Sequence, residues 1–277
     1  MTTTTLAPEP ATPAGRNPEA VRRRERAVPA PIPFGRIAGI ELRKMFDTRS
    51  GFWLMASLVV LSLAASAATI IFVDADNLDY EGFASAWGIP MSVILPMIAV
   101  LAVTSEWSAR SALTTFTLVP GRGRVIGAKA VVTALVGVAA IAVAALVGAL
   151  GYLGVATVMD LDPVWNLSFA ELARVTLASE IGMFMGFMLG MLFRSSPAAI
   201  VAYFVYALVL PTVSSALAST NTWWAENATW FDLNWATMNL YTEMTDKTWA
   251  QLGVASVIWL VVPMLVGLRL VLRSEVK

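Results

Sequence analysis

Between Ala130 and Met159 the chain reads AVVTALVGVAAIAVAALVGALGYLGVATVM, which is 30 residues without one charged side chain. A helix needs about 20 apolar residues to cross the hydrocarbon core of a bilayer, which is about 30 Å thick. This stretch is long enough to cross as a tilted helix or to project beyond the bilayer. It therefore predicts an integral membrane protein with an all-α fold.

Five further apolar stretches reach or approach the same length, so we predict six membrane spans and place both termini on one side of the membrane. Pro96 lies inside the second span and is expected to kink it, at a cost that neighbouring helices absorb. The predicted spans are about 51–73, 87–104, 130–159, 175–193, 197–218 and 249–268.

Composition supports this class and argues against several functions. Of the 277 residues, 57% are hydrophobic and only 14% are charged, whereas about a quarter of the residues in a soluble domain are charged. The 19 basic and 19 acidic residues cancel, so net charge gives no reason to expect a nucleic-acid partner. The absence of cysteine and histidine removes the usual general base and most transition-metal ligands. We expect no metal site and no catalytic residue in this chain.

The basic residues predict the orientation. With both termini inside, 17 of the 19 Lys and Arg residues fall in cytoplasmic segments, and only Arg174 and Lys247 fall outside. This distribution follows the positive-inside rule. Residues 1–33 are rich in Thr, Pro, Ala and Arg, so we predict a disordered cytoplasmic tail, followed by a six-span domain over residues 34–277.

Residues 34–47 precede the first span and predict an amphipathic helix that lies at the membrane interface. The helix could simply anchor the chain, with Arg43 and Lys44 attracted to anionic lipid. That interpretation leaves Glu41 unexplained, because its carboxylate falls on the apolar side of the helix. Glu41 therefore needs a polar partner, either in neighbouring protein or among lipid headgroups.

The polar segment from Ser105 to Lys129 separates the second and third spans. Ser105 is expected to cap a short helix with Glu106 in its first turn, and Pro120-Gly121 is expected to end that helix. Leu113 and Phe116 belong to an apolar edge on this cytoplasmic helix. The edge either lies on the membrane surface or docks on a partner protein.

Two features of the fourth span could serve function or packing. Glu180 is the single acidic residue that the predicted boundaries place within the hydrocarbon, where a carboxylate usually has a partner or a wet cavity. A role in a substrate pathway or proton relay and a structural hydrogen-bonding role both remain open. Gly182, Gly186 and Gly190 form a stripe that allows another helix to approach closely. That helix could belong to the same chain or to a second subunit.

Between the fifth and sixth spans, residues 219–248 are rich in Trp, Phe and Tyr. Such rings favour the headgroup level, so we predict short helices in the outer leaflet. Asn221, Asn227 and Asp232 supply the cap or turn signals for these helices.

Taken with this topology, three segments resemble the type-two permease subunits of bacterial ATP-binding-cassette (ABC) exporters. The central one is Thr104–Pro120 (TSEWSARSALTTFTLVP), followed by Arg122, Arg124 and Ala128-Lys129. The two others are Glu41–Arg49 (ELRKMFDTR), before the first span, and Leu192–Ile200 (LFRSSPAAI), between the fourth and fifth spans. The topological resemblance covers residues 34 to the end.

The resemblance implies a permease subunit in a bacterial plasma membrane, with an elbow helix before the first span and a cytoplasmic coupling helix after the second. It implies a partner ATPase that binds ATP and Mg²⁺, and a second permease subunit, identical or paralogous. This chain would itself carry no cofactor and no enzymatic activity. The implied coupling residues are Glu106, Arg110, Leu113, Phe116, Pro120 and Arg122, and the elbow residues are Glu41, Arg43 and Lys44.

Two other classes compete with this interpretation. A secondary transporter usually carries ion-coupling groups in several spans and often has internal repeats, and neither is evident here. A non-transporting membrane scaffold or sensor would account for six spans but not for a docking helix.

Overall fold

The computed structural model describes residues 32–73, 79–108 and 122–273. The chain divides into two units, Met1–Pro33 and Phe34–Lys277, and every helix named below belongs to the second. All regular structure in the described residues is helical, and six helices are long and apolar enough to cross a membrane. The predicted all-α, six-span architecture is confirmed at this level.

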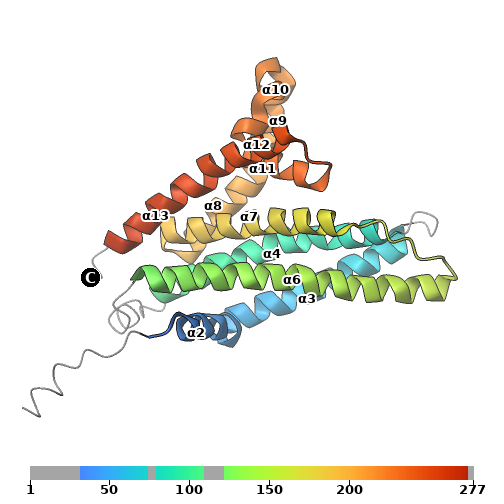
Figure 1. Ribbon diagram of the computed structural model, residues 1–277, viewed down its shortest axis with the longest axis horizontal. Coiled ribbons are helices and arrows are strands. Elements are labelled where there is room, and N and C mark those ends of the chain that lie inside the picture. The colour runs from blue at the N-terminus through green and yellow to red at the C-terminus, as the bar shows by residue number, and fades with distance from the viewer. Residues whose placement is uncertain (1–31, 74–78, 109–121, 274–277) are drawn as a thin grey trace, which may run out of the picture. The chain divides into compact units, whose positions relative to one another are not determined.

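The six long helices alternate in direction, and Figure 1 shows their arrangement. A shorter helix, α2 (Phe34–Asp47), precedes the first of them. Thr48 separates α2 from the first long helix, because its hydroxyl accepts a hydrogen bond from Gly51 N and caps the new helix. The long helices are α3 (Arg49–Phe72), α4 (Tyr80–Ser108), α6 (Arg122–Met159), α7 (Phe169–Phe193), the fifth span α8 (Ser196–Phe204), η2 (Val205–Val209) and α9 (Leu210–Thr220), and the sixth span α12 (Asp246–Ser256), η4 (Val257–Val261) and α13 (Val262–Arg273).

Several helices extend beyond the predicted spans. Helix α4 begins at Tyr80 and ends at Ser108, and α6 is 38 residues long, beginning at Arg122. Hydropathy marks the apolar middle of a helix, whereas polar residues can continue its hydrogen-bonded ladder into the interface. The prediction that Ser105 caps a new helix is wrong, because α4 passes through Ser105 without a break.

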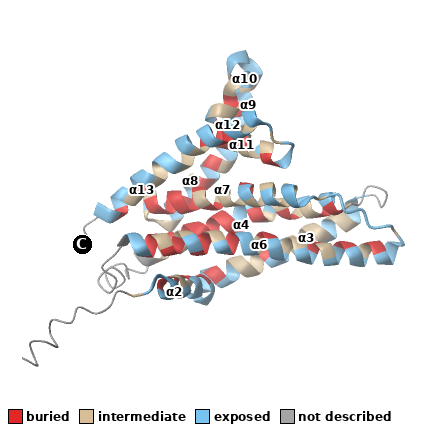
Figure 2. Ribbon diagram, viewed as in Figure 1, coloured by how far each residue is buried: buried red, intermediate tan, exposed pale blue. Residues whose placement is uncertain are grey.

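Helices α4 and α7 form the centre of the second unit, as the buried positions in Figure 2 show. The apolar stretch of α4 is 56% buried, whereas that of α3 is only 6% buried. Helices α3 and α6 both pack on α4 but make few contacts with each other. The most deeply buried side chains of the two central helices include Leu95, Val100, Met183, Met185, Phe187 and Met191.

The glycine stripe of α7 packs against α4 of the same chain. A Cβ added to Gly186 would lie 2.4 Å from the carbonyl oxygen of Pro96, and one added to Gly190 would lie 3.2 Å from Val103 Cβ. Gly182 is looser, with Pro96 Cγ at 3.7 Å. Small residues let two helix backbones approach closely, so the stripe holds α7 onto α4.

Pro96 lies inside α4, and the helix continues through it. Because proline has no N–H, the carbonyl of Ser92, four residues earlier, loses its helical donor. The hydroxyl of Tyr203 in α8 donates to that carbonyl at 2.8 Å. A side chain from the fifth span thus completes the hydrogen bonding of the second.

The fifth and sixth spans each contain a π-helical segment followed, one residue later, by a proline. In the fifth span the carbonyl of Tyr206 would accept from residue 210 in an α-helix or from residue 211 in a π-helix. Leu210 N instead donates to Val205 O, and residue 211 is proline, so neither donor reaches the Tyr206 carbonyl. Asn234 Nδ2 donates to this carbonyl at 3.2 Å. The Tyr206 and Trp259 rings lie 6.3 Å apart, so the two π-segments contact each other.

The short helices predicted between the fifth and sixth spans are present as α10 (Thr222–Phe231) and α11 (Leu233–Met238). Asn221 caps α10 and Asp232 caps α11, each by accepting hydrogen bonds from backbone N–H groups. These two cap predictions are confirmed. Asn227 is not a cap, because it lies inside α10 and its amide donates to the carbonyl of Trp223.

Candidate functional site

The candidate site lies where α2 packs against α6, α3 and α4. Helix α2 forms over the range expected from the sequence, but its apolar side divides between two environments. Ile37, Glu41 and Met45 form a stripe at four-residue spacing that is buried against the protein. On a helical wheel Phe34 and Leu42 share the apolar side of the helix with this stripe, but both are exposed. The sequence therefore predicted the helix correctly, but the buried face is narrower than the apolar side of the helix.

Glu41 is paired within the protein. Lys129 of α6 donates from Nζ to Glu41 Oε2 at 2.5 Å and to the carbonyl of Ala102 in α4 at 2.9 Å. Lys44, one turn along α2, donates to Glu41 Oε1 at 2.8 Å. Both Glu41 and Lys129 are only 5% exposed. One lysine therefore joins three helices, and we call Glu41, Lys129 and the Ala102 carbonyl the ionic joint.

Because the ionic joint is buried, its charges need well-placed partners. Removing a charge from water costs on the order of several kcal/mol unless a partner and further hydrogen bonds compensate it. Here each oxygen of the Glu41 carboxylate has a lysine donor, and Lys129 has both a carboxylate and a carbonyl acceptor. A cavity of about 30 Å³ lies beside the joint, lined in part by Thr48, Ser105 and Lys129. This volume is large enough for a water molecule.

The joint lies close to the connection between α4 and α6. Ala102 is six residues from the end of α4, and Lys129 is seven residues from the start of α6. The intervening residues 109–121 include Arg110, Leu113, Phe116 and Pro120, and these four predicted coupling residues lie outside the described part of the chain. The side chains of Glu106 and Arg122, at the two helix ends, also lie outside it.

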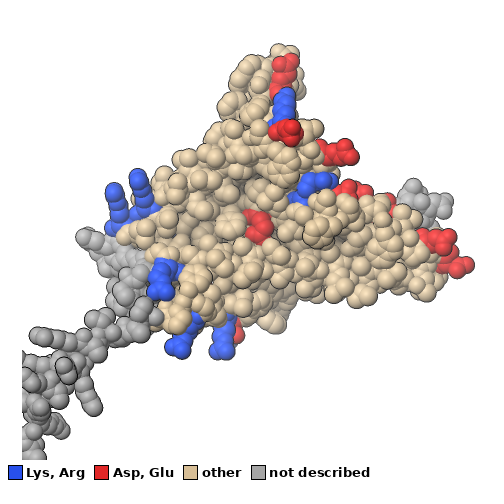
Figure 3. All heavy atoms as spheres, viewed as in Figure 1, with Lys and Arg blue, Asp and Glu red and all other residues tan. Residues whose placement is uncertain are grey.

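Charge is divided between the two ends of the long helices. Figure 3 shows Lys and Arg side chains gathered at the end where α3 begins, and Asp and Glu gathered mainly at the other end. Arg43 is exposed on α2, whereas Lys44 is half-buried. Arg174 is one of the two exceptions predicted from the sequence, since it lies at the opposite end, near the start of α7.

Glu180 lies against α6 rather than in an ion pair. A Cβ added to Gly137 would lie 2.1 Å from Glu180 Oε1, so the carboxyl group occupies the space that a side chain at residue 137 would need. Both carboxyl oxygens are buried, and neither has a hydrogen-bond partner among the described residues. The sequence singled out Glu180 but gave no signal for Gly137, which lies 43 positions earlier in the chain.

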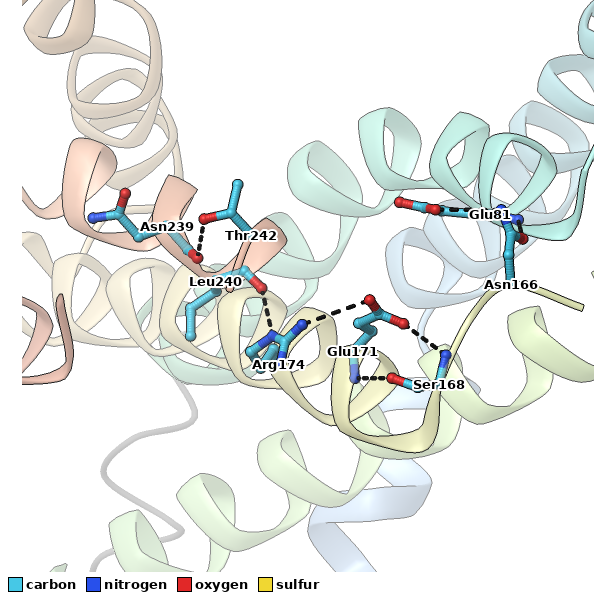
Figure 4. Close-up of polar contacts among 8 residues, drawn as sticks. All are labelled: Glu81, Asn166, Ser168, Glu171, Arg174, Asn239, Leu240 and Thr242. Carbon is cyan, nitrogen blue, oxygen red and sulfur yellow. Dashed lines mark hydrogen bonds and ion pairs between the residues drawn. The ribbon is translucent and has the colours of Figure 1, made fainter. Parts of the chain in front are cut away.

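Arg174 does not pair with Glu180. Its guanidinium lies 3.8 Å from Glu171 and donates to the carbonyl of Leu240 at 3.2 Å, as drawn in Figure 4. Leu240 belongs to η3 (Asn239–Tyr241), a short helical turn that follows α11. Ser168 and Glu171 form a capping box at the start of α7. Arg174 therefore ties the segment between the last two spans to α7.

Lys129 is the residue of the ionic joint that the sequence identifies least well. The sequence places Lys129 at the end of the polar segment before the third span and does not predict its pairing with Glu41. The signal was the unexplained carboxylate on the apolar side of residues 34–47, which needed a polar partner in neighbouring protein or among lipid headgroups. Nothing in the sequence identified Lys129, rather than another basic residue, as the partner of Glu41.

The described residues contain no cluster of three or more acidic, histidine or cysteine side chains that could hold a metal ion. The ionic joint has one carboxylate, one lysine and one backbone carbonyl, an arrangement that suits a structural connection. Comparisons with protein-family models and with curated proteins find no match to this chain.

Proposed function

We propose that this chain is the membrane-spanning permease subunit of an ATP-driven ABC exporter in a bacterial plasma membrane. The observation that supports the proposal most is the ionic joint. It fastens the interfacial helix α2 to α4 and α6, the two helices that bracket residues 109–121. A force applied to those residues by a partner would act on α2, α4 and α6 together.

In this proposal residues 111–120 form a coupling helix that docks in a groove of a separate ATPase, with Glu106, Arg110 and Arg122 at its base. Glu41, Arg43 and Lys44 belong to an elbow helix beside the same interface. The partner binds ATP and Mg²⁺ and hydrolyses the ATP. Movement of the coupling helix then passes through the ionic joint into α4, which is packed on α7 along the glycine stripe.

A second permease subunit, identical or paralogous, completes the pathway in this proposal. The exposure of α3 supports this part, because only 6% of its apolar stretch is buried within the chain. The two other classes remain as alternatives. A secondary transporter would work without an ATPase, and a scaffold or sensor would not move a substrate.

The test is co-purification of an ATPase from native membranes under mild conditions. Leu113→Asp or Phe116→Asp places a charge on the apolar edge and should abolish the association, because the edge would no longer bury in the partner. Thr114→Asp is the matched control, since on a helix residue 114 lies on the side opposite that edge. It should leave the association intact.

Retention of the ATPase by Phe116→Asp would remove the coupling-helix assignment. If the unmodified protein never brings an ATPase with it, the exporter proposal fails and the secondary transporter becomes the better candidate.

A further inference from the structure

An apolar groove of about 690 Å³ opens between α3 and α6, with α4 at its back and α2 at one end. It exists because α3 and α6 both pack on α4 while making few contacts with each other. Along α3 the groove runs from Met55 to Ser66, and along α6 from Val132 to Val147. At 1.5 Å per residue these lengths are about 17 and 22 Å, which is somewhat more than half of the ~30 Å hydrocarbon core.

The lining is almost wholly apolar, and no charged residue belongs to it. Its hydroxyl groups are those of Ser62 and Ser66. Ser66 is engaged, because its hydroxyl donates to Ser62 O and accepts from Trp87 Nε1 at 2.7 Å. The hydroxyl of Ser62 is buried and has no hydrogen-bond partner among the described residues, so it is the one group of the described lining that is left to bind a polar atom. A groove with a single such hydroxyl and an otherwise apolar lining favours a hydrocarbon chain.

The end of the groove at α2 has a different character. Ala38, Gly39, Leu42 and Phe46 contribute to the lining there. Arg36 lies three residues before Gly39 and Arg43 lies four residues after it, so all three residues share one stripe of α2. Both arginines are exposed. Asp47 is the one exposed acidic residue of α2 and lies one turn beyond Arg43, which leaves the stripe with a net positive charge.

We propose that this groove binds one anionic phospholipid of the leaflet next to α2. One acyl chain lies between α3 and α6, and the headgroup phosphate lies between Arg36 and Arg43. The length of the groove and its apolar lining match an acyl chain, and the cations at one end match an anionic headgroup. An interfacial helix is also where a lipid headgroup meets a protein. The inference does not depend on the exporter proposal.

The test is native mass spectrometry of the full chain, purified in mild detergent with equal amounts of phosphatidylglycerol and phosphatidylcholine that carry the same acyl chains. Ala139 lines the groove and is exposed, so Ala139→Trp should fill the groove without disturbing the core. Ala142→Trp is the matched control, because Ala142 is also exposed on α6 but does not belong to the lining. Arg36→Gln combined with Arg43→Gln removes the two cations.

We expect the unmodified protein to retain one phosphatidylglycerol in preference to phosphatidylcholine, even when inorganic phosphate is added. Ala139→Trp should lose the retained lipid, and Ala142→Trp should keep it. The double arginine variant should keep a lipid but lose the preference for phosphatidylglycerol. The ratio of bound phosphatidylglycerol to phosphatidylcholine should fall roughly fivefold for each cation removed.

Four results would overturn the proposal. Equal retention by Ala139→Trp and Ala142→Trp would mean that the lipid binds elsewhere. A headgroup preference unchanged in the double arginine variant would remove the role of Arg36 and Arg43. Displacement of the lipid by inorganic phosphate would indicate a simple anion site. Conversion of a dimer to a monomer by Ala139→Trp would show that the groove holds a second copy of the chain.

Discussion

Among single residues, Glu41 makes two ion pairs that differ in burial, one with Lys129 and one with Lys44. The pair with Lys129 is buried on both sides, whereas the side chain of Lys44, on the other oxygen, is 39% exposed. Burial decides what each pair contributes. Removal of one partner of a buried pair leaves an uncompensated charge in a poorly solvated place, whereas an exposed lysine is readily replaced by water and salt.

We therefore expect Lys129→Met to lower the free energy of unfolding by about 3–5 kcal/mol. Lys44→Met, the matched control, should cost no more than about 1 kcal/mol. The double variant Glu41→Met with Lys129→Met should recover a large part of the loss, because two apolar side chains then replace the pair. Denaturant titration of the four proteins in one detergent measures these differences. Equal losses of unfolding free energy for Lys129→Met and Lys44→Met would show that the buried pair stabilises the fold no more than the exposed one.

At the scale of helices, the contact between α4 and α7 depends on where small residues fall. The three stripe glycines differ in the space around them, so they should differ in their tolerance of a methyl group. Gly186→Ala would place Cβ against the backbone of Pro96, which cannot move without displacing α4. We expect a loss of about 1–3 kcal/mol in the free energy of unfolding.

Gly154→Ala in α6 is the control, since nothing lies within 4 Å of the added Cβ. It should gain about 0.5–1 kcal/mol, because alanine loses less conformational freedom than glycine in a helix. Gly182→Ala should be close to this control, because its nearest neighbour is at ordinary contact distance. A thermal melt of the three variants tests the order, and a Gly186→Ala protein as stable as the control would place α7 elsewhere.

The helices also show what could be predicted from the sequence and what could not. The six spans, the amphipathic segment from Phe34 to Asp47 and the short helices after the fifth span follow from local composition and periodicity, which the sequence displays directly. The partners do not follow. Pro96 indicates that the carbonyl of Ser92 needs a hydrogen-bond donor, but only the packing of α8 on α4 shows that Tyr203 supplies it. Likewise, the sequence indicates that Glu41 needs a polar partner, but only the structure shows that Lys129 is that partner.

At the scale of the whole molecule, the orientation in the membrane decides whether an ATPase can reach residues 109–121. Because the chain has no cysteine, single cysteines at exposed sites can report on sidedness without a background. Asp47 and Arg273 lie at the end of the helices where α3 begins, and Asp162 and Asp246 lie at the other end. The positive-inside rule predicts that the first pair lies in the cytoplasm.

With a membrane-impermeant maleimide added to intact cells, we expect Asp162→Cys and Asp246→Cys to be labelled. Asp47→Cys and Arg273→Cys should be labelled only after the membrane is opened. Labelling before and after permeabilisation of the same cells supplies the control, since every site must react once it is accessible. The reverse pattern would put residues 109–121 outside the cell, where no ATP-hydrolysing partner could act on them. The ionic joint would then remain a structural feature, but it could no longer transmit the movement of a cytoplasmic motor.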